Sequence, residues 1–107
     1  MLQDNAKKLL NELKEGLKVV YGSRLKGLYL YGSYARGEQE EGSDFDILIV
    51  LDTFNDYGDE IDRTGYLASD LSLKYGISVS RFVVTEKDWK SRESAFLANV
   101  REEALAA

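Results

Sequence analysis

The sequence contains no cysteine, no histidine and no proline among its 107 residues. The lack of cysteine excludes a disulfide framework and a thiolate metal site. The lack of histidine excludes imidazole acid–base catalysis, Ser-His and Cys-His nucleophiles, and most zinc sites. Any catalysis by this chain therefore depends on carboxylates, hydroxyls, backbone amides and metal ions.

Long apolar runs and an excess of basic residues are also missing. No stretch approaches the roughly 20 apolar residues that span a bilayer, and the start of the chain, Met1 to Lys8, lacks the apolar core of a signal peptide. We therefore expect a cytoplasmic protein without membrane contact. Lysine and arginine total 14 against 19 acidic residues, for a net charge of −5. Because phosphate contacts dominate nucleic-acid affinity, we expect no direct nucleic-acid binding, although a metal-bound nucleotide needs only a local site.

The residues that are present suit one soluble domain spanning 1–107. Hydrophobic residues make up 44% of the chain and charged residues 31%, which is an ordinary balance for a domain with a single core. No linker, repeat or low-complexity segment divides it. Hydrophobic spacing predicts helices over 4–21, 56–74 and 93–106, and strands over 25–31, 45–51 and 77–84. This order predicts an α+β fold, a small mixed sheet with helices packed on one face.

Two carboxylates stand out at the start of the second predicted strand. Asp44 and Asp46 are separated by Phe45 alone, so side-chain alternation places both on the same face of the strand. The opposite face carries Phe45, Ile47, Ile49 and Leu51, and must be the one packed against helices. The two acids then lie on the uncovered side, where a cation would relieve their mutual repulsion. Hard oxygen ligands without histidine or cysteine favour Mg²⁺ or Mn²⁺.

A glycine-serine pair follows the first predicted strand directly. Gly32 allows the backbone to approach a ligand closely, and residues 34–37 are expected to form a short helix whose amino end suits phosphate oxygens. Alone, an Asp-x-Asp is usually a solvated strand entry, a Gly-Ser pair is usually a turn, and Arg36 is usually a surface charge. Together they place phosphate donors beside metal ligands, which favours phosphoryl or nucleotidyl transfer.

Residues 32–37 and 43–50 resemble the signature of the minimal nucleotidyltransferases, which belong to the DNA polymerase β-like superfamily. That signature is Gly-Ser, ten residues and Asp-x-Asp, and Tyr34 to Ser43 supplies the spacing. The resemblance implies a fold like the polymerase β palm. It also implies ATP as donor, Mg²⁺ or Mn²⁺ as cofactor, and transfer of a nucleoside monophosphate, AMP, to an acceptor hydroxyl.

The same resemblance implies a role for each matching residue. Gly32 and Ser33 would hold the triphosphate, and Asp44 and Asp46 would be the catalytic metal ligands. Arg36 and Gly37 also match the nucleotide-binding motif, with Arg36 either a phosphate contact or a brace for the loop. Minimal nucleotidyltransferases are often antitoxins that modify a tyrosine of a HEPN-domain toxin, so the acceptor is expected on such a partner or on a surface made by homo-oligomerisation.

The sequence departs from the family at the third carboxylate, which usually comes from a later strand. Ser78 stands where that acid is expected, and serine is neither a general base near neutral pH nor a good Mg²⁺ ligand. Either the acceptor is activated differently, or Glu86 or another acid reaches the site, or activity is weak or absent. Two other functions therefore stay open: a degenerate module that neutralises a partner by covering it, and a nucleotide sensor that binds without transfer.

Tyrosines also lie close to the motif. Tyr29, Tyr31 and Tyr34 are expected to serve as strand and core residues more often than as targets of modification.

Overall fold

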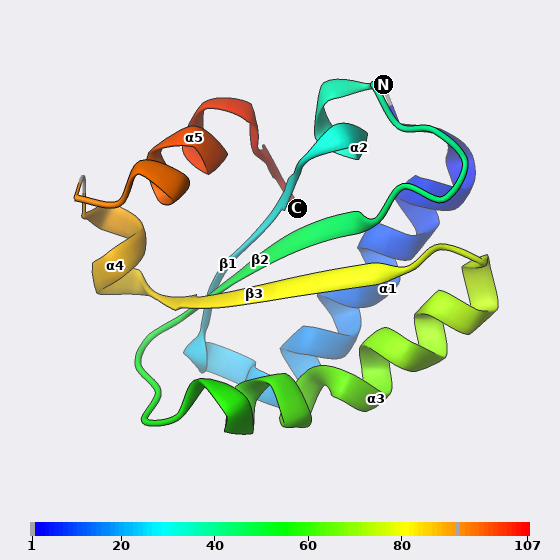
Figure 1. Cartoon of the computed structure of the whole chain (residues 1–107). Helices are drawn as coiled ribbons and strands as arrows, with labels where there is room; N and C mark the ends of the chain where they lie inside the picture. The colour runs from blue at the N-terminus through cyan, green and yellow to red at the C-terminus, as the bar shows by residue number, and fades with distance from the viewer. Residues whose placement is uncertain (1, 92) are drawn as a thin grey trace.

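The computed structural model describes residues 2–91 and 93–107, and it follows the predicted alternation of helices and strands (Figure 1). Its elements are α1 (Asp4–Tyr21), a 3₁₀ turn η1 (Gly22–Arg24), β1 (Leu25–Tyr31), α2 (Ser33–Arg36), β2 (Phe45–Leu51), α3 (Tyr57–Tyr75), β3 (Val79–Thr85), α4 (Glu86–Lys90), α5 (Ala95–Glu103) and β4 (Leu105–Ala106). Within the described residues, no helix combines the length and the apolar character that a membrane crossing requires.

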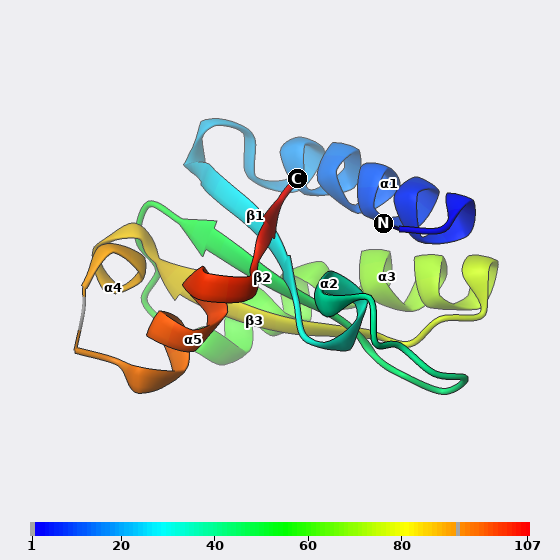
Figure 2. The same ribbon diagram turned by 90° about the horizontal axis from the view of Figure 1, so that it is seen from above.

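The four strands form one mixed sheet in the order β3-β2-β1-β4. β1 runs antiparallel to both β2 and β4, whereas β2 and β3 run parallel. Figure 2 shows α5 in front of the strands and α3 behind them. The α+β class with a mixed sheet is therefore confirmed.

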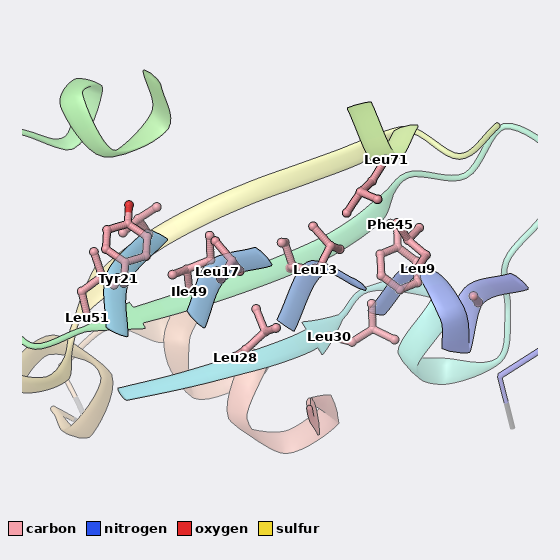
Figure 3. Packing of buried hydrophobic residues seen from close by; sticks show 13 residues of the cluster. Leu9, Leu13, Leu17, Tyr21, Leu28, Leu30, Phe45, Ile49, Leu51 and Leu71 are labelled. Carbon is pink, nitrogen blue, oxygen red and sulfur yellow. The ribbon is translucent and has the colours of Figure 1, made fainter. Parts of the chain in front are cut away.

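One face of the sheet packs against α1 and α3. Leu9, Leu13 and Leu17 recur at four-residue steps along α1 and are almost wholly buried against the strands (Figure 3). They meet alternate residues of β2, including Ile49 and Leu51, as side-chain alternation predicts. Fully burying one such side chain stabilises the fold by about 1.5–3 kcal/mol, so this layer fixes the position of the β1–β2 hairpin.

The other face is covered over part of its area, which differs from the expectation of helices on one face only. Leu48 and Val50 pack there with Leu97 and Val100 of α5 and with Val84. The sequence of β2 explains this difference. Most residues on both faces of the strand are apolar, so both faces must pack against other elements. Helices α1 and α3 follow the predicted arrangement, and α5 adds a smaller second core.

The C-terminal segment differs most from its prediction as a single helix over 93–106. The side chain of Ser94 accepts a hydrogen bond from the Leu97 amide at 3.2 Å and starts α5 at Ala95. After Glu103 the chain becomes extended and β4 pairs with β1, with Leu105 opposite Leu30. Pairing with the open edge of β1 thus overrides the helix propensity of the final alanines.

Candidate active site

The β1–β2 hairpin brings the two parts of the sequence motif together. Tyr31, the last residue of β1, lies directly opposite Asp46 in the antiparallel ladder. The chain leaves β1 through Gly32 and forms α2, which lies beside the end of β1 and the start of β2 (Figure 2). The Gly-Ser turn and the acids therefore occupy one corner of the sheet.

Gly32 has a backbone that only glycine adopts readily, with φ 76° and ψ −158°. A Cβ added here would lie 3.1 Å from Cγ of Asp46 and would collide with its Oδ2. The carboxylate of Asp46 thus packs directly against the Gly32 backbone. The absence of a side chain at this position makes that contact possible.

The two acids share a charged environment at the mouth of the sheet. Asp46 is half-buried and Asp44 is exposed. Partial burial raises the pKa of the Asp46 carboxyl, the negative charges of Asp44 and Glu103 raise it further, and the positive charge of Arg36 opposes them. Asp44 and Asp46 are thus close enough to repel each other, a condition that a bound cation relieves.

The donor set of this corner fits a magnesium ion that is completed by its substrate. No group of three or more histidine, cysteine, aspartate or glutamate side chains is arranged to hold a metal in residues 2–91 and 93–107. Mg²⁺ commonly takes only one or two protein carboxylates and fills its remaining positions with water and substrate phosphates. Asp44 and Asp46 supply that number of carboxylates, both with hard oxygen donors.

Arg36 braces the loop that follows Gly32. Its Nε donates to Glu38 Oε1 at 2.7 Å and its Nη1 donates to Glu103 Oε2 at 2.6 Å. Gly37 ends α2 in the left-handed conformation, with φ 70°, and its amide donates to the carbonyls of Ser33 and Tyr34. Both residues therefore have a structural place in the loop, and α2 is tied through Arg36 to the end of α5.

The predicted place of the missing third acid needs correction. In the parallel register, Ser80 is the β3 residue beside Asp46. Ser78 precedes β3, and its carbonyl accepts a hydrogen bond from the Phe45 amide at 2.7 Å. Glu86 begins α4 past the opposite end of the strand, where its side chain pairs with Lys90 at 3.6 Å, so it does not reach the site.

The acid that the sequence interpretation missed is Glu103. It ends α5 and accepts the hydrogen bond from Arg36 beside the motif loop. The sequence contains one indication of this position. Glu103 lies three residues after the buried Val100 and so on the sheet-facing side of an amphipathic helix. No local pattern connects it with Asp46, which is far away along the chain.

The three tyrosines near the motif are packed, as the sequence suggested. The Tyr29 ring lies 4.7 Å from that of Trp89, and the Tyr34 ring lies 5.1 Å from that of Phe45, between centroids. Tyr31 is half-buried, and burial followed by the charge of Asp46 raises its pKa to about 12. Its hydroxyl therefore stays protonated at neutral pH.

The family model described as a nucleotidyltransferase domain matches residues 6–99 of this chain. The match includes the Gly-Ser turn, both aspartates and most of the sheet. The chain belongs to the nucleotidyltransferase domain family. The predicted assignment to the nucleotidyltransferases is confirmed by the family model and by the relatives.

Relatives and solved structures agree with that assignment. Two proteins of Methanocaldococcus jannaschii, both described as "Putative protein adenylyltransferase", are similar to this nucleotidyltransferase. One is 41% identical over 92% of this chain and 94% of its own length, and the other is 35% identical over 72% and 77%.

Two solved structures share the fold. A toxin–antitoxin structure with AMP-PNP has a TM-score of 0.63 and 23% identity, covering 91% of this nucleotidyltransferase and 72% of that chain. A complex of a tri-AMPylated Shewanella oneidensis HEPN toxin with an MNT antitoxin gives a TM-score of 0.55 and 21% identity over 99% and 71%.

Proposed function

We propose that this nucleotidyltransferase transfers AMP from ATP to a protein hydroxyl, and that the acceptor is a tyrosine of a HEPN-type toxin partner. The observation that carries the proposal is the packing of the Asp46 carboxylate against the Gly32 backbone, because it joins a metal ligand to a phosphate-binding turn. The described activity of the Methanocaldococcus relatives and the AMPylated toxin in a structural neighbour support the donor and the acceptor.

Each residue of the corner has a part in this proposal. Gly32 and Ser33 hold the triphosphate through backbone amides, which have no partner within the helix at its first turn, and through the serine hydroxyl. Asp44 and Asp46 hold Mg²⁺ or Mn²⁺, which when bound neutralises charge on the phosphate oxygens. Arg36 keeps the loop in place through its two carboxylate partners.

In the proposed reaction, the acceptor oxygen forms a bond to the α-phosphorus of ATP as the bond between that phosphorus and the bridging oxygen breaks. Pyrophosphate leaves, and the acceptor hydroxyl proton passes to solvent. β3 contains no acid beside Asp46 that could take this proton. A tyrosine suits such a site better than serine, because a phenol with a pKa of about 10 loses its proton more readily than an aliphatic alcohol.

The test is transfer of label from α-labelled ATP to a co-expressed HEPN partner in the presence of Mg²⁺. We expect Asp46→Asn and Asp44→Asn to lower transfer by at least about a hundredfold, as losses of electrostatic stabilisation typically do. Asp70→Asn, which changes an exposed aspartate on α3, is the matched control and should keep full activity. Equal labelling by the wild type and Asp44→Asn/Asp46→Asn would refute the proposal.

The lack of an acid on β3 favours one second candidate, a binding module that neutralises its partner by covering it. In that case the complex with the partner keeps its affinity in Asp44→Asn/Asp46→Asn, and no Mg²⁺-dependent labelling occurs in the wild type. A nucleotide sensor would instead show a higher melting temperature with ATP and Mg²⁺ but no transfer, since a ligand that binds only the folded state stabilises it.

A further inference from the structure

Five aromatic rings form an unbroken row that starts at Tyr31, on the face of the sheet that carries Asp46, and runs to Phe54, which packs against the main core on the other face. The centroid distances along it are 5.9 Å for Tyr31–Phe96, 5.1 Å for Phe96–Phe82, 5.8 Å for Phe82–Tyr57 and 6.4 Å for Tyr57–Phe54. The rings come from β1, α5, β3, α3 and the loop before α3. Segments that are distant in sequence therefore meet to build this row.

The row is only partly covered by the rest of the chain. The exposed fractions are 37% for Phe82, 43% for Phe96 and 41% for Tyr57. These rings line a groove of about 430 Å³ between β3, α5 and the start of α3. That volume lies in the range of about 300–1,000 Å³ that small-molecule sites occupy. Packing of the core alone does not account for three neighbouring aromatic rings left open to solvent.

The row begins beside the proposed active site. Tyr31 and Ser80 are the two cross-strand neighbours of Asp46, one on each side. Phe82 follows Ser80 by two residues and so lies on the same face, about 6.6 Å further along β3 at about 3.3 Å per residue. A ribose separates the base of a nucleotide from its α-phosphate, so a nucleotide whose phosphates lie at the carboxylate corner can extend its base along β3 toward Phe82.

We propose, building on the function above, that Phe82 and Phe96 form the nucleobase subsite of this domain. The ribose of the bound nucleoside triphosphate lies over Ser80. The two phenylalanine rings are inclined at 51° to each other, so the base stacks on one ring and meets the other at an angle. Stacking uses the π-face that every base has. The subsite therefore contributes affinity for purines and pyrimidines with little reading of their edges.

A nucleobase fits this groove better than a segment of a partner protein. The groove has the size of one small ligand, and the row of rings that lines it starts at Tyr31, beside the corner that would hold the phosphates. A stable protein interface would need roughly 800 Å² from each partner, and a row of partly covered rings supplies only the centre of such a patch. Partner binding by the row is therefore one of the outcomes that the experiment distinguishes.

The experiment measures binding by isothermal titration calorimetry with two probes, ATP and inorganic tripolyphosphate, each with Mg²⁺. We expect Phe82→Leu/Phe96→Leu to weaken ATP binding by about ten- to a hundredfold, the usual loss for removed stacking. Tripolyphosphate, which has no base, should bind the wild type and this variant equally. Phe82→Tyr/Phe96→Tyr keeps both rings and should keep ATP affinity. Tyr66→Leu, which removes a ring that is 85% exposed on α3, is the matched control.

The outcomes separate this subsite from the proposed activity. Unchanged ATP affinity in Phe82→Leu/Phe96→Leu, with loss in Asp46→Asn, would overturn the subsite and leave the transfer reaction standing. ATP binding that needs the phenylalanines but neither Mg²⁺ nor Asp46 would support the subsite and count against the reaction. Equal weakening of ATP and tripolyphosphate, or weakening of partner binding alone, would assign the rings to folding or to the partner and overturn the subsite.

Discussion

At the residue scale, Gly32 has two constraints that a single methyl group would violate. Alanine at φ 76° strains the backbone by about 1–3 kcal/mol, and its Cβ would displace the Asp46 carboxylate. We expect Gly32→Ala to weaken binding of ATP with Mg²⁺ by at least about tenfold in a calorimetric titration. Gly22→Ala is the matched control, because Gly22 also has a positive φ of 56° but a Cβ there would meet nothing within 4 Å. Equal ATP affinity in the two variants would show that the contact with Asp46 is irrelevant.

The charge on Asp46 is the second feature at this scale. Burial, Asp44 and Glu103 all disfavour its ionised form, so the folded protein without a cation carries an unrelieved repulsion. Asp46→Asn should therefore raise the melting temperature in EDTA by up to a few degrees. The same substitution should abolish the further rise that ATP and Mg²⁺ give the wild type. A lower melting temperature of Asp46→Asn in EDTA would contradict this account of the charges.

At the scale of elements, the ion pair between Arg36 and Glu103 joins α2 to the end of α5. Glu103→Gln should leave global stability nearly unchanged, since ion pairs with exposed partners contribute little, while it loosens the attachment of α5. Amide hydrogen exchange should become faster in the last turn of α5 and in β4. Glu102→Gln, at an exposed position next to it, is the control. Identical exchange in both variants would mean that the pair does not hold α5.

The elements that the sequence predicts best are those with a long, one-sided hydrophobic pattern. The leucines of α1 and the apolar runs of β1 and β2 predict the observed bounds of these elements. Each pattern reflects burial against the core and can be recognised from neighbouring residues alone. β4 was missed, since Leu105 and Ala106 form a strand only through pairing with β1. α4 was not predicted as a helix of its own, and α5 ends before the predicted helix over 93–106 does. Thr85 and Ser94 each start a helix by accepting a hydrogen bond, and only the second core shows where the chain must turn.

At the scale of the whole molecule, the candidate site also has a part that the sequence predicts and a part that only tertiary packing determines. Gly32 and Asp46 could be placed together from sequence because one hairpin joins them, and the register of β1 and β2 follows from their alternation. Glu103 and the aromatic row could not, because α5 returns to the sheet from far along the chain and its position depends on the second core. Local pattern therefore predicts the acids of the corner, and tertiary packing supplies their surroundings.

Tyr21 joins the two helices that cover the main core, and it links the stability of the whole fold to pH. Its hydroxyl, on α1, donates to Glu60 Oε1 on α3 at 2.8 Å, and the two residues are 5% and 4% exposed. Tyr21→Phe would remove one of the two donors to this buried carboxylate oxygen and leave only Arg63 Nε, which donates to it at 3.1 Å. We expect it to lower the free energy of unfolding at pH 7 by about 1.5–3 kcal/mol, the usual range for a hydrogen bond to a charged group, as measured by urea denaturation.

The same contact sets the direction of the pH dependence. Burial, followed by the hydrogen bond to Glu60 and its negative charge, raises the pKa of Tyr21 from 10.0 to about 12, although Arg63 and Arg24 oppose the shift. The folded state thus holds this proton more tightly than the unfolded state. Its stabilising effect is complete below pH 10 and is lost as the pH rises toward 12. Urea denaturation across that interval should show the wild type losing stability faster than Tyr21→Phe, so that the difference between them narrows. A constant difference from pH 7 to pH 12 would mean that the Tyr21 proton is not held by the fold.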